Sequence, residues 1–128
     1  MKKYLLAVVI AGIWMNLNEF VRNELVLKSY WVDGFSTLGL VFPGEPVNGV
    51  IWMLWAFLFV AMMLWLRRSI GEYQSVLLSW GLGYVLMWIA LGNVGVLPKG
   101  LLYVAAPWSF AEVYVAALIG RYIDTERG

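Results

Sequence analysis

Four long apolar runs separated by short polar segments set the pattern of this chain. The second run is the clearest, because residues 47–66 carry no charged side chain and are followed by Arg67 and Arg68. About twenty residues at a helical rise of about 1.5 Å each cover the roughly 30 Å hydrocarbon layer of a bilayer. The other runs predict helices over about residues 4–26, 76–97 and 101–122. The pattern therefore predicts an all-α integral membrane protein, a single domain over residues 1–128 with four transmembrane helices in an antiparallel bundle.

The first run has a basic start and an apolar stretch, as a secretory signal peptide does. However, only Trp14, Met15 and Asn16 follow the stretch, and no small-x-small cleavage site is present. We therefore expect an uncleaved first span. Its helix is expected to continue to about Val26, since Glu24 and Lys28 are spaced as a favourable i,i+4 ion pair.

The longest connection covers residues 29–46, which we expect to form an outer loop. Tyr30 and Trp31 suit a membrane interface, and residues 43–46 read Pro-Gly-Glu-Pro. Residues 35–42 are mostly apolar but too short to cross a bilayer, so they either lie along the interface or form a re-entrant piece. Shorter connections are expected at residues 69–75 and 98–100.

Polar residues interrupt two of the spans in a regular way. On the first helix, Gly12, Asn16, Glu19 and Asn23 fall at steps of four, three and four and so share one stripe. On the fourth, small and polar residues repeat at similar steps and include the second intramembrane carboxylate. That stripe consists of Ala105, Ser109, Glu112, Ala116 and Gly120. Ionisable groups at membrane depth usually face a bundle interior and find partners there.

Counting the helical rise brings several of these groups to one level. Glu19 lies about 22 Å and Arg22 about 27 Å above the inner face, and Asn93 about 25 Å. Glu112 lies about 16 Å from the outer face. The candidate ion- or ligand-binding cluster therefore lies in the outer half of the membrane, with Glu112 below it. Its other members are Asn16, Glu19, Arg22, Asn93 and Ser109.

A purely structural interpretation covers most of the same residues. Glu19 and Arg22 are three apart and could pair within their own helix, with Arg22 reaching the outer headgroups. The asparagines could form modest helix–helix hydrogen bonds. Glu112 has no cation on its own helix, so it must be protonated, pair with another helix or face water.

Two apolar features favour packing. Trp52, Trp55, Phe59 and Met62 share a face of the second helix, either as the wall of a pocket or as a packing and lipid surface. Gly81 and Gly83 allow close approach of a neighbouring helix to the third span.

The distribution of basic residues predicts the orientation. Six of them fall on one side of a four-span topology, namely Lys2, Lys3, Arg67, Arg68, Arg121 and Arg127. Lys28 and Lys99 fall on the other side, with Arg22 near it. The positive-inside rule places both termini in the cytoplasm of a multi-pass cell-membrane protein.

Composition narrows the chemistry further. The chain is 62% hydrophobic, against about 45–50% apolar residues in soluble domains. It has no cysteine and no histidine, which removes thiol chemistry and the usual zinc and haem ligands. No nucleophile–base pair is evident. The net charge is +1, and the basic residues form no stripe. We therefore expect no enzyme activity, no cofactor and no nucleic-acid partner.

Two kinds of function remain. The first is binding or conduction of a small ion, proton or polar solute by a transport protein, which we expect to be a homo-oligomer. The second is a non-catalytic accessory or interaction subunit of a membrane complex. In length, four spans and the carboxylate at Glu19, the chain is similar to the small multidrug resistance transporters. It shares no motif with them, so no residue roles are carried over.

Overall fold

The computed structural model describes residues 1–125, and within that range every regular element is a helix. Two short segments have the wider π-helical winding and are labelled η. In chain order the elements are α1 (Lys2–Phe20), η1 (Val21–Val26), α2 (Lys28–Thr37), α3 (Pro46–Ile70), α4 (Glu72–Trp80), η2 (Gly81–Val85), α5 (Leu86–Asn93) and α6 (Leu102–Ile123).

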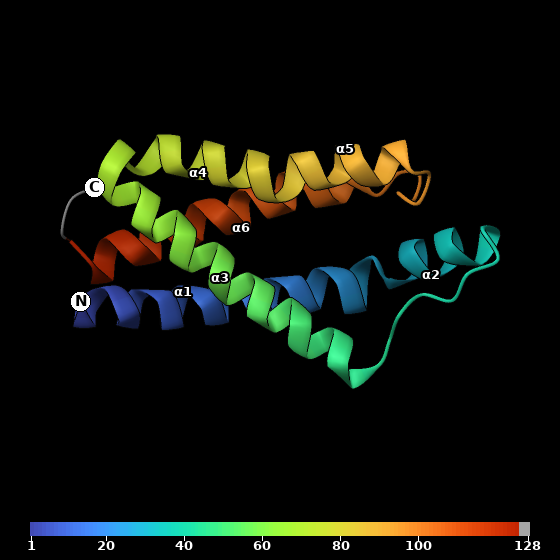
Figure 1. Cartoon of the computed structure of the whole chain (residues 1–128), viewed down its shortest axis with the longest axis horizontal. Helices are drawn as coiled ribbons and strands as arrows, with labels where there is room; N and C mark the ends of the chain where they lie inside the picture. Colours follow the sequence, from blue (N-terminus) through green and yellow to red (C-terminus); the bar gives the residue numbers. More distant parts are fainter. Residues whose placement is uncertain (126–128) are drawn as a thin grey trace.

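These elements form four stretches long and apolar enough to cross a membrane. They are Lys2–Val26, Pro46–Ile70, Glu72–Asn93 and Leu102–Ile123. The prediction of an all-helical, four-span membrane protein is therefore confirmed at this level, and the exposed apolar side chains along the helices imply contact with lipid. The start of α1 and the end of α6 lie at the same end of the bundle (Figure 1).

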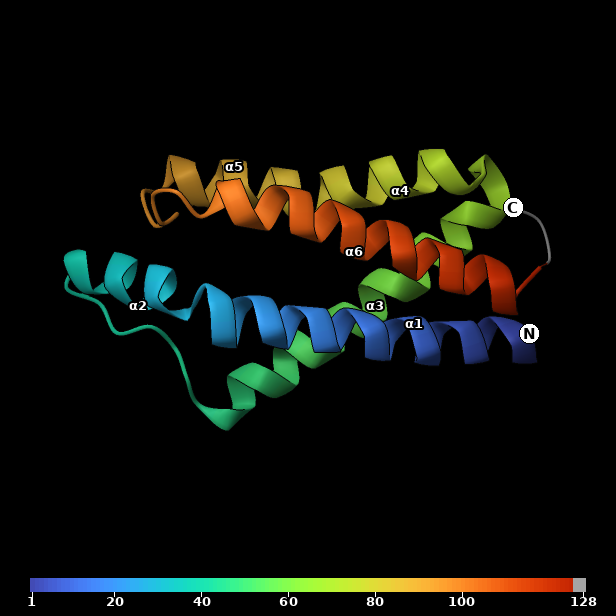
Figure 2. The same ribbon diagram turned by 180° about the vertical axis from the view of Figure 1, so that it is seen from behind.

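The predicted outer loop over residues 29–46 is wrong for its first part, because Lys28–Thr37 form the helix α2. This helix extends beyond the end of η1 instead of turning back among the spans (Figures 1 and 2). The following segment returns over it, since the ring of Phe42 lies 5.7 Å from that of Trp31 and 5.2 Å from that of Phe35. The apolar residues of this connection thus pack on one another.

The predicted connection over residues 69–75 is also too long. Only Gly71 separates α3 from α4, and its φ of 89° is a conformation that other residues rarely adopt. The third span accordingly begins at Glu72 and ends at Asn93, about four residues before the predicted bounds.

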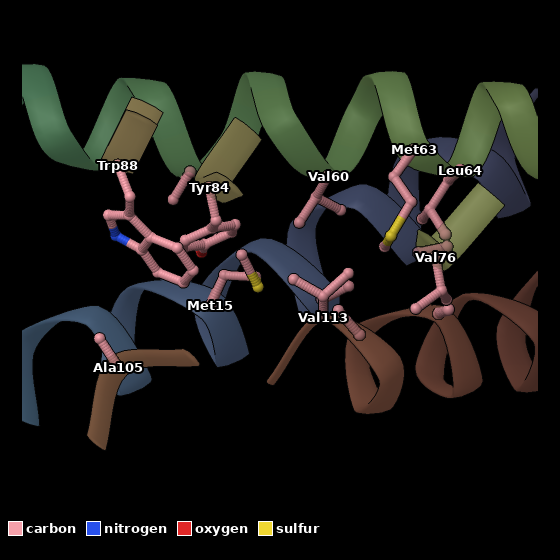
Figure 3. Packing of buried hydrophobic residues seen from close by; sticks show 14 of the residues in the cluster. Met15, Val60, Met63, Leu64, Val76, Tyr84, Trp88, Ala105 and Val113 are labelled. Carbon is pink, nitrogen blue, oxygen red and sulfur yellow. The ribbon is translucent and has the colours of Figure 1, made fainter. Parts of the chain in front are cut away.

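The buried core lies where α1, α3, α4 and α6 meet. Met15, Val60 and Val113 come from three helices and point toward one another (Figure 3). Nearer the chain ends, Leu64 and Val76 continue the same core. Because these side chains are fully or almost fully buried, they hold the helices in one arrangement by close packing.

The helix α3 crosses the other spans obliquely, and its first turns lie away from α4 and α5 (Figures 1 and 2). The crossing with η2 is tight at Gly83, where an added Cβ would lie 2.5 Å from the Phe59 ring. At Gly81 an added Cβ would meet nothing within 4 Å. The predicted close approach therefore holds at Gly83 and not at Gly81.

Candidate functional site

Four polar side chains from three spans meet inside the bundle, and we call them the central cluster: Glu19, Arg22, Tyr84 and Glu112. The Arg22 guanidinium lies 2.7 Å from Glu19 Oε1 through Nη2 and donates to Glu112 Oε1 through Nη1. The Tyr84 hydroxyl donates to Glu19 Oε1 at 2.6 Å and lies 3.4 Å from Glu112 Oε2. Two carboxylates therefore share one guanidinium and one hydroxyl.

Burial makes the charge balance of this cluster important. Arg22 is 3% exposed and Glu112 is 1% exposed, whereas the Glu19 side chain is 16% exposed. With both carboxylates ionised, the cluster carries one negative charge more than Arg22 can neutralise. An uncompensated charge is costly in a dry interior, so the cluster favours a partner that adds one positive charge.

Two of the four residues lie on π-helical segments. Arg22 is the second residue of η1, and Tyr84 is the fourth residue of η2. A π-helical turn changes the direction in which the following side chains point, and such segments are frequent at functional sites. In this chain η1 carries Arg22 to its contact with Glu112 on α6. The segment η2 carries Tyr84 to its contacts with Glu19 on α1 and Glu112 on α6.

Aromatic rings pack around Tyr84. The rings of Trp55, Phe59 and Trp88 lie 5.5, 5.6 and 5.9 Å from that of Tyr84. The indole of Trp14 donates to the backbone carbonyl of Glu112 at 3.0 Å. The predicted aromatic face of α3 is thus divided: Trp55 and Phe59 pack against Tyr84, while Trp52 and Met62 are exposed.

A chain of hydrogen bonds leads from the cluster toward α2. Asn23 Nδ2 donates to Glu19 Oε2 at 3.2 Å, and Trp31 Nε1 donates to Asn23 Oδ1 at 3.2 Å. Glu19, the most exposed carboxylate of the cluster, is therefore also the one connected to the end of the bundle that carries α2.

Of the six residues predicted for the site, the structure brings together Glu19, Arg22 and Glu112. Glu112 lies within the cluster and not below it, because its partner is Arg22 on the first span. The alternative in which Arg22 reaches the outer headgroups is wrong, because its side chain is buried by these contacts.

The other three predicted residues lie apart from the cluster. Asn16 donates to the carbonyl of Gly12 on its own helix, and Ser109 accepts a hydrogen bond from Trp80 Nε1 at 2.9 Å. Asn93 is exposed at the last residue of α5. Asn93 reaches the end of its span because that span begins at Glu72, whereas Asn16 and Ser109 stay among the helices but have hydrogen-bond partners outside the cluster.

Tyr84 is the member that sequence reasoning missed. One signal was present, because tyrosine usually lies at membrane interfaces and this one falls in the middle of an apolar span. A buried tyrosine hydroxyl needs a hydrogen-bond partner, and Glu19 provides it.

A second group of polar side chains lies at the end of the bundle where α1 begins and α6 ends. The Arg68 guanidinium lies 2.7 Å from Asp124 Oδ2, and Arg67 Nη2 donates to the Asp124 carbonyl at 2.5 Å. Arg121 Nη1 lies 3.1 Å from Glu72 Oε2. Of the basic residues predicted for this side, Arg127 lies outside the described residues.

Between the two polar groups the buried side chains are mainly apolar. They include Ala7, Ala11, Met15, Val60, Met63, Leu64, Val76, Val113, Ala116 and Ala117. Among the described residues, the polar side chains of Ser75 and Ser79 on α4 are also buried there, so this layer is mainly but not wholly apolar.

The chain matches no known family model, no curated protein and no solved structure, so the site is interpreted from its own geometry.

Proposed function

We propose that the protein is a proton-binding membrane transport protein and that the central cluster is its binding site. The observation that supports this most directly is the pairing of Glu19 and Glu112 with a single arginine. One added proton makes the cluster neutral, which favours its uptake in a dry environment.

A proton suits the cluster better than a metal cation does. Arg22 and Tyr84 already occupy the hydrogen-bonding positions between the two carboxylates. A metal ion needs several oxygen ligands around it, whereas a proton can be held on one carboxylate oxygen and shared through a hydrogen bond.

The proposed access to the cluster is from the end that carries α2. Glu19 is partly exposed and bonded to Asn23 there, whereas apolar residues separate Glu112 from the opposite end. Release to the opposite side therefore requires a conformational change, and the π-helical segments that carry Arg22 and Tyr84 are the proposed place for it.

In the proposed orientation both termini lie in the cytoplasm and α2 lies outside the cell membrane, with successive spans antiparallel. The support is the positive-inside rule applied to the basic residues at the end that holds the termini. Lys2, Lys3, Arg67, Arg68 and Arg121 all lie in segments that end there.

The test is proton uptake into liposomes that contain the full-length protein and a trapped pH-sensitive dye. We expect an imposed proton gradient to collapse faster than in empty liposomes, and Glu112→Gln to abolish the difference. Glu24→Gln is the matched control, because Glu24 is an exposed carboxylate paired with Lys28. Equal rates with and without protein, or a fully active Glu112→Gln variant, contradict the proposal.

A second candidate, an accessory or interaction subunit, is favoured by the first turns of α3. Val47, Val50, Ile51, Trp52 and Leu54 are exposed there, on a part of the helix that lies away from α4 and α5 (Figure 1). These residues would pack against a partner subunit or a second copy of the chain. Protein that remains monomeric in lipid nanodiscs and purifies without a stoichiometric partner contradicts this candidate.

A further inference from the structure

An open cavity lies at the end of the bundle that carries α2, opposite the end that holds the ion pairs of Arg68 and Arg121. It has a volume of about 590 Å³ and lies between α2 and the segment that joins α5 to α6. Cavities that bind small molecules in proteins have volumes of roughly 300–1,000 Å³. The cavity is therefore large enough for a small polar ligand.

The two walls of this cavity carry opposite charges. Asp33 lies on the α2 wall, and Lys99 lies on the wall formed by residues 95–99. Within residues 1–125, neither the Asp33 carboxylate nor the Lys99 ammonium group has a hydrogen bond or an ion pair. By contrast, Glu24 and Lys28, two charged side chains near this end of the bundle, pair with each other.

The remaining lining is suited to a ligand with a polar head and a short apolar portion. Ser29 and Tyr30 contribute hydroxyl groups, while Leu38 and Leu97 contribute apolar surface. The two walls touch at the base, where an added Cβ on Gly34 would lie 3.2 Å from Pro98 Cγ. This close contact fixes α2 against the α5–α6 connection.

We propose that this cavity binds a zwitterion that carries an ammonium group and a phosphate group, as in a phosphoethanolamine head. The ammonium would bind the Asp33 carboxylate and the phosphate would bind Lys99, so each charge of the ligand would gain an opposite charge. Such a ligand has two sources, a free solute or the headgroup of a membrane lipid, and both present the same chemistry to the cavity.

The position of the cavity connects it to the central cluster. Tyr30 lines the cavity, and the adjacent Trp31 donates to Asn23, which in turn donates to Glu19. A ligand that holds α2 against the α5–α6 connection would therefore also stabilise the hydrogen-bonded position of Glu19. The binding proposal itself does not depend on proton transport by the cluster.

The experiment uses full-length protein in nanodiscs of phosphatidylglycerol, a lipid without an ammonium group. In one arm, soluble glycerophosphoethanolamine is titrated and its binding is measured by calorimetry. In the other arm, phosphatidylethanolamine is mixed into the nanodiscs, and the lipid retained by the protein is measured by native mass spectrometry.

We expect Asp33→Asn and Lys99→Gln each to lower affinity or retention by about tenfold or more, the loss typical of one charged hydrogen bond. Glu24→Gln and Lys28→Gln are the matched controls, because they remove the same charges from the same end of the bundle outside the cavity. All four side chains are exposed or partly exposed, so the variants are expected to fold.

Binding in the soluble arm that both cavity variants weaken identifies a free solute. Retention of phosphatidylethanolamine that both variants weaken, without binding of the soluble probe, identifies the lipid headgroup. The proposal is overturned if neither probe binds, or if the cavity variants bind as well as the controls. If Glu112→Gln loses proton uptake but binds the ligand normally, the result supports proton binding at the cluster and shows that ligand binding does not depend on it.

Discussion

Arg22 pairs with carboxylates on two different spans while it is almost fully buried. Removing it leaves Glu19 and Glu112 close together without a cation. By contrast, both side chains of the Glu24–Lys28 ion pair are exposed. Removing the cation is therefore expected to cost much more stability in the buried cluster than in the exposed Glu24–Lys28 pair.

We expect Arg22→Met to lower the free energy of unfolding by about 3–5 kcal/mol, the usual cost of leaving a buried charge unpaired. Thermal unfolding in detergent, followed by circular dichroism, is the measurement. Lys28→Met is the control, with an expected change within about 1 kcal/mol. Adding Glu112→Gln to Arg22→Met is expected to recover part of the loss, since one of the unpaired charges is then removed. Equal effects of Arg22→Met and Lys28→Met would contradict the role of the cluster.

The Tyr84 hydroxyl allows a smaller change to be tested. Tyr84→Phe removes one donor to Glu19 and leaves the ring and its contacts with Trp55 and Trp88. We expect a loss of about 1–3 kcal/mol in unfolding free energy, because the ionised Glu19 carboxylate loses a hydrogen bond. Tyr103→Phe is a suitable control, because Tyr103 is 89% exposed. A Tyr84→Phe variant as stable as Tyr103→Phe would show that the hydroxyl contributes nothing.

At the scale of elements, the crossing of α3 with the third span depends on the absence of a side chain at Gly83. The Phe59 ring occupies the space that a Cβ would need, and the same ring packs on Tyr84. The position of Tyr84 in the cluster is therefore coupled to the packing of α3.

Gly83→Ala is expected to lower the unfolding temperature, with a cost of about 1–3 kcal/mol for overpacking. Gly81→Ala, two residues away in the same π-helical segment, is expected to leave the unfolding temperature unchanged or slightly raised, because its added Cβ meets nothing. Thermal unfolding of the two variants side by side is the measurement. Equal losses would indicate that the glycines serve the π-helical winding and not the crossing.

The spans were predictable because their signal is composition over about twenty residues, which tolerates errors of a few positions. The helix α2 was not, since its apolar residues pack locally on Phe42 and give no long apolar run. In the site, the sequence left three possibilities for Glu112, namely protonation, pairing with another helix or contact with water, and the structure shows the pairing. Asn93 was misplaced because its span begins four residues earlier than predicted, which moves Asn93 to the end of the helix. The π-helical turns also change helix rotation in a way that no periodic pattern predicts.

At the scale of the whole molecule, the proposed orientation can be tested directly because the chain contains no cysteine. A single introduced thiol is then the only one that a reagent can modify. Ser36→Cys lies on α2, and Ser69→Cys lies in the last turn of α3 at the opposite end of the bundle.

We expect a membrane-impermeant maleimide to label Ser36→Cys on intact cells and Ser69→Cys only after lysis. Both side chains are exposed, so failure to label is not expected from burial. Labelling of Ser69→Cys on intact cells, with Ser36→Cys protected until lysis, would reverse the orientation. Labelling of both on intact cells would indicate two orientations in one membrane.

The apolar layer between the central cluster and the ion pairs of Arg68 and Arg121 has an electrical consequence for the proposed function. Voltage falls mainly across the least polarisable part of a membrane protein, and here that part is the packed layer around Met15, Val60 and Val113. Moving one elementary charge across the whole membrane changes its energy by about 2.3 kcal/mol per 100 mV. In the proposed orientation, a proton that leaves the cluster inward crosses most of this field, while one that leaves outward crosses little of it. Under the proposed function and orientation, membrane potential would therefore act chiefly on the inward step.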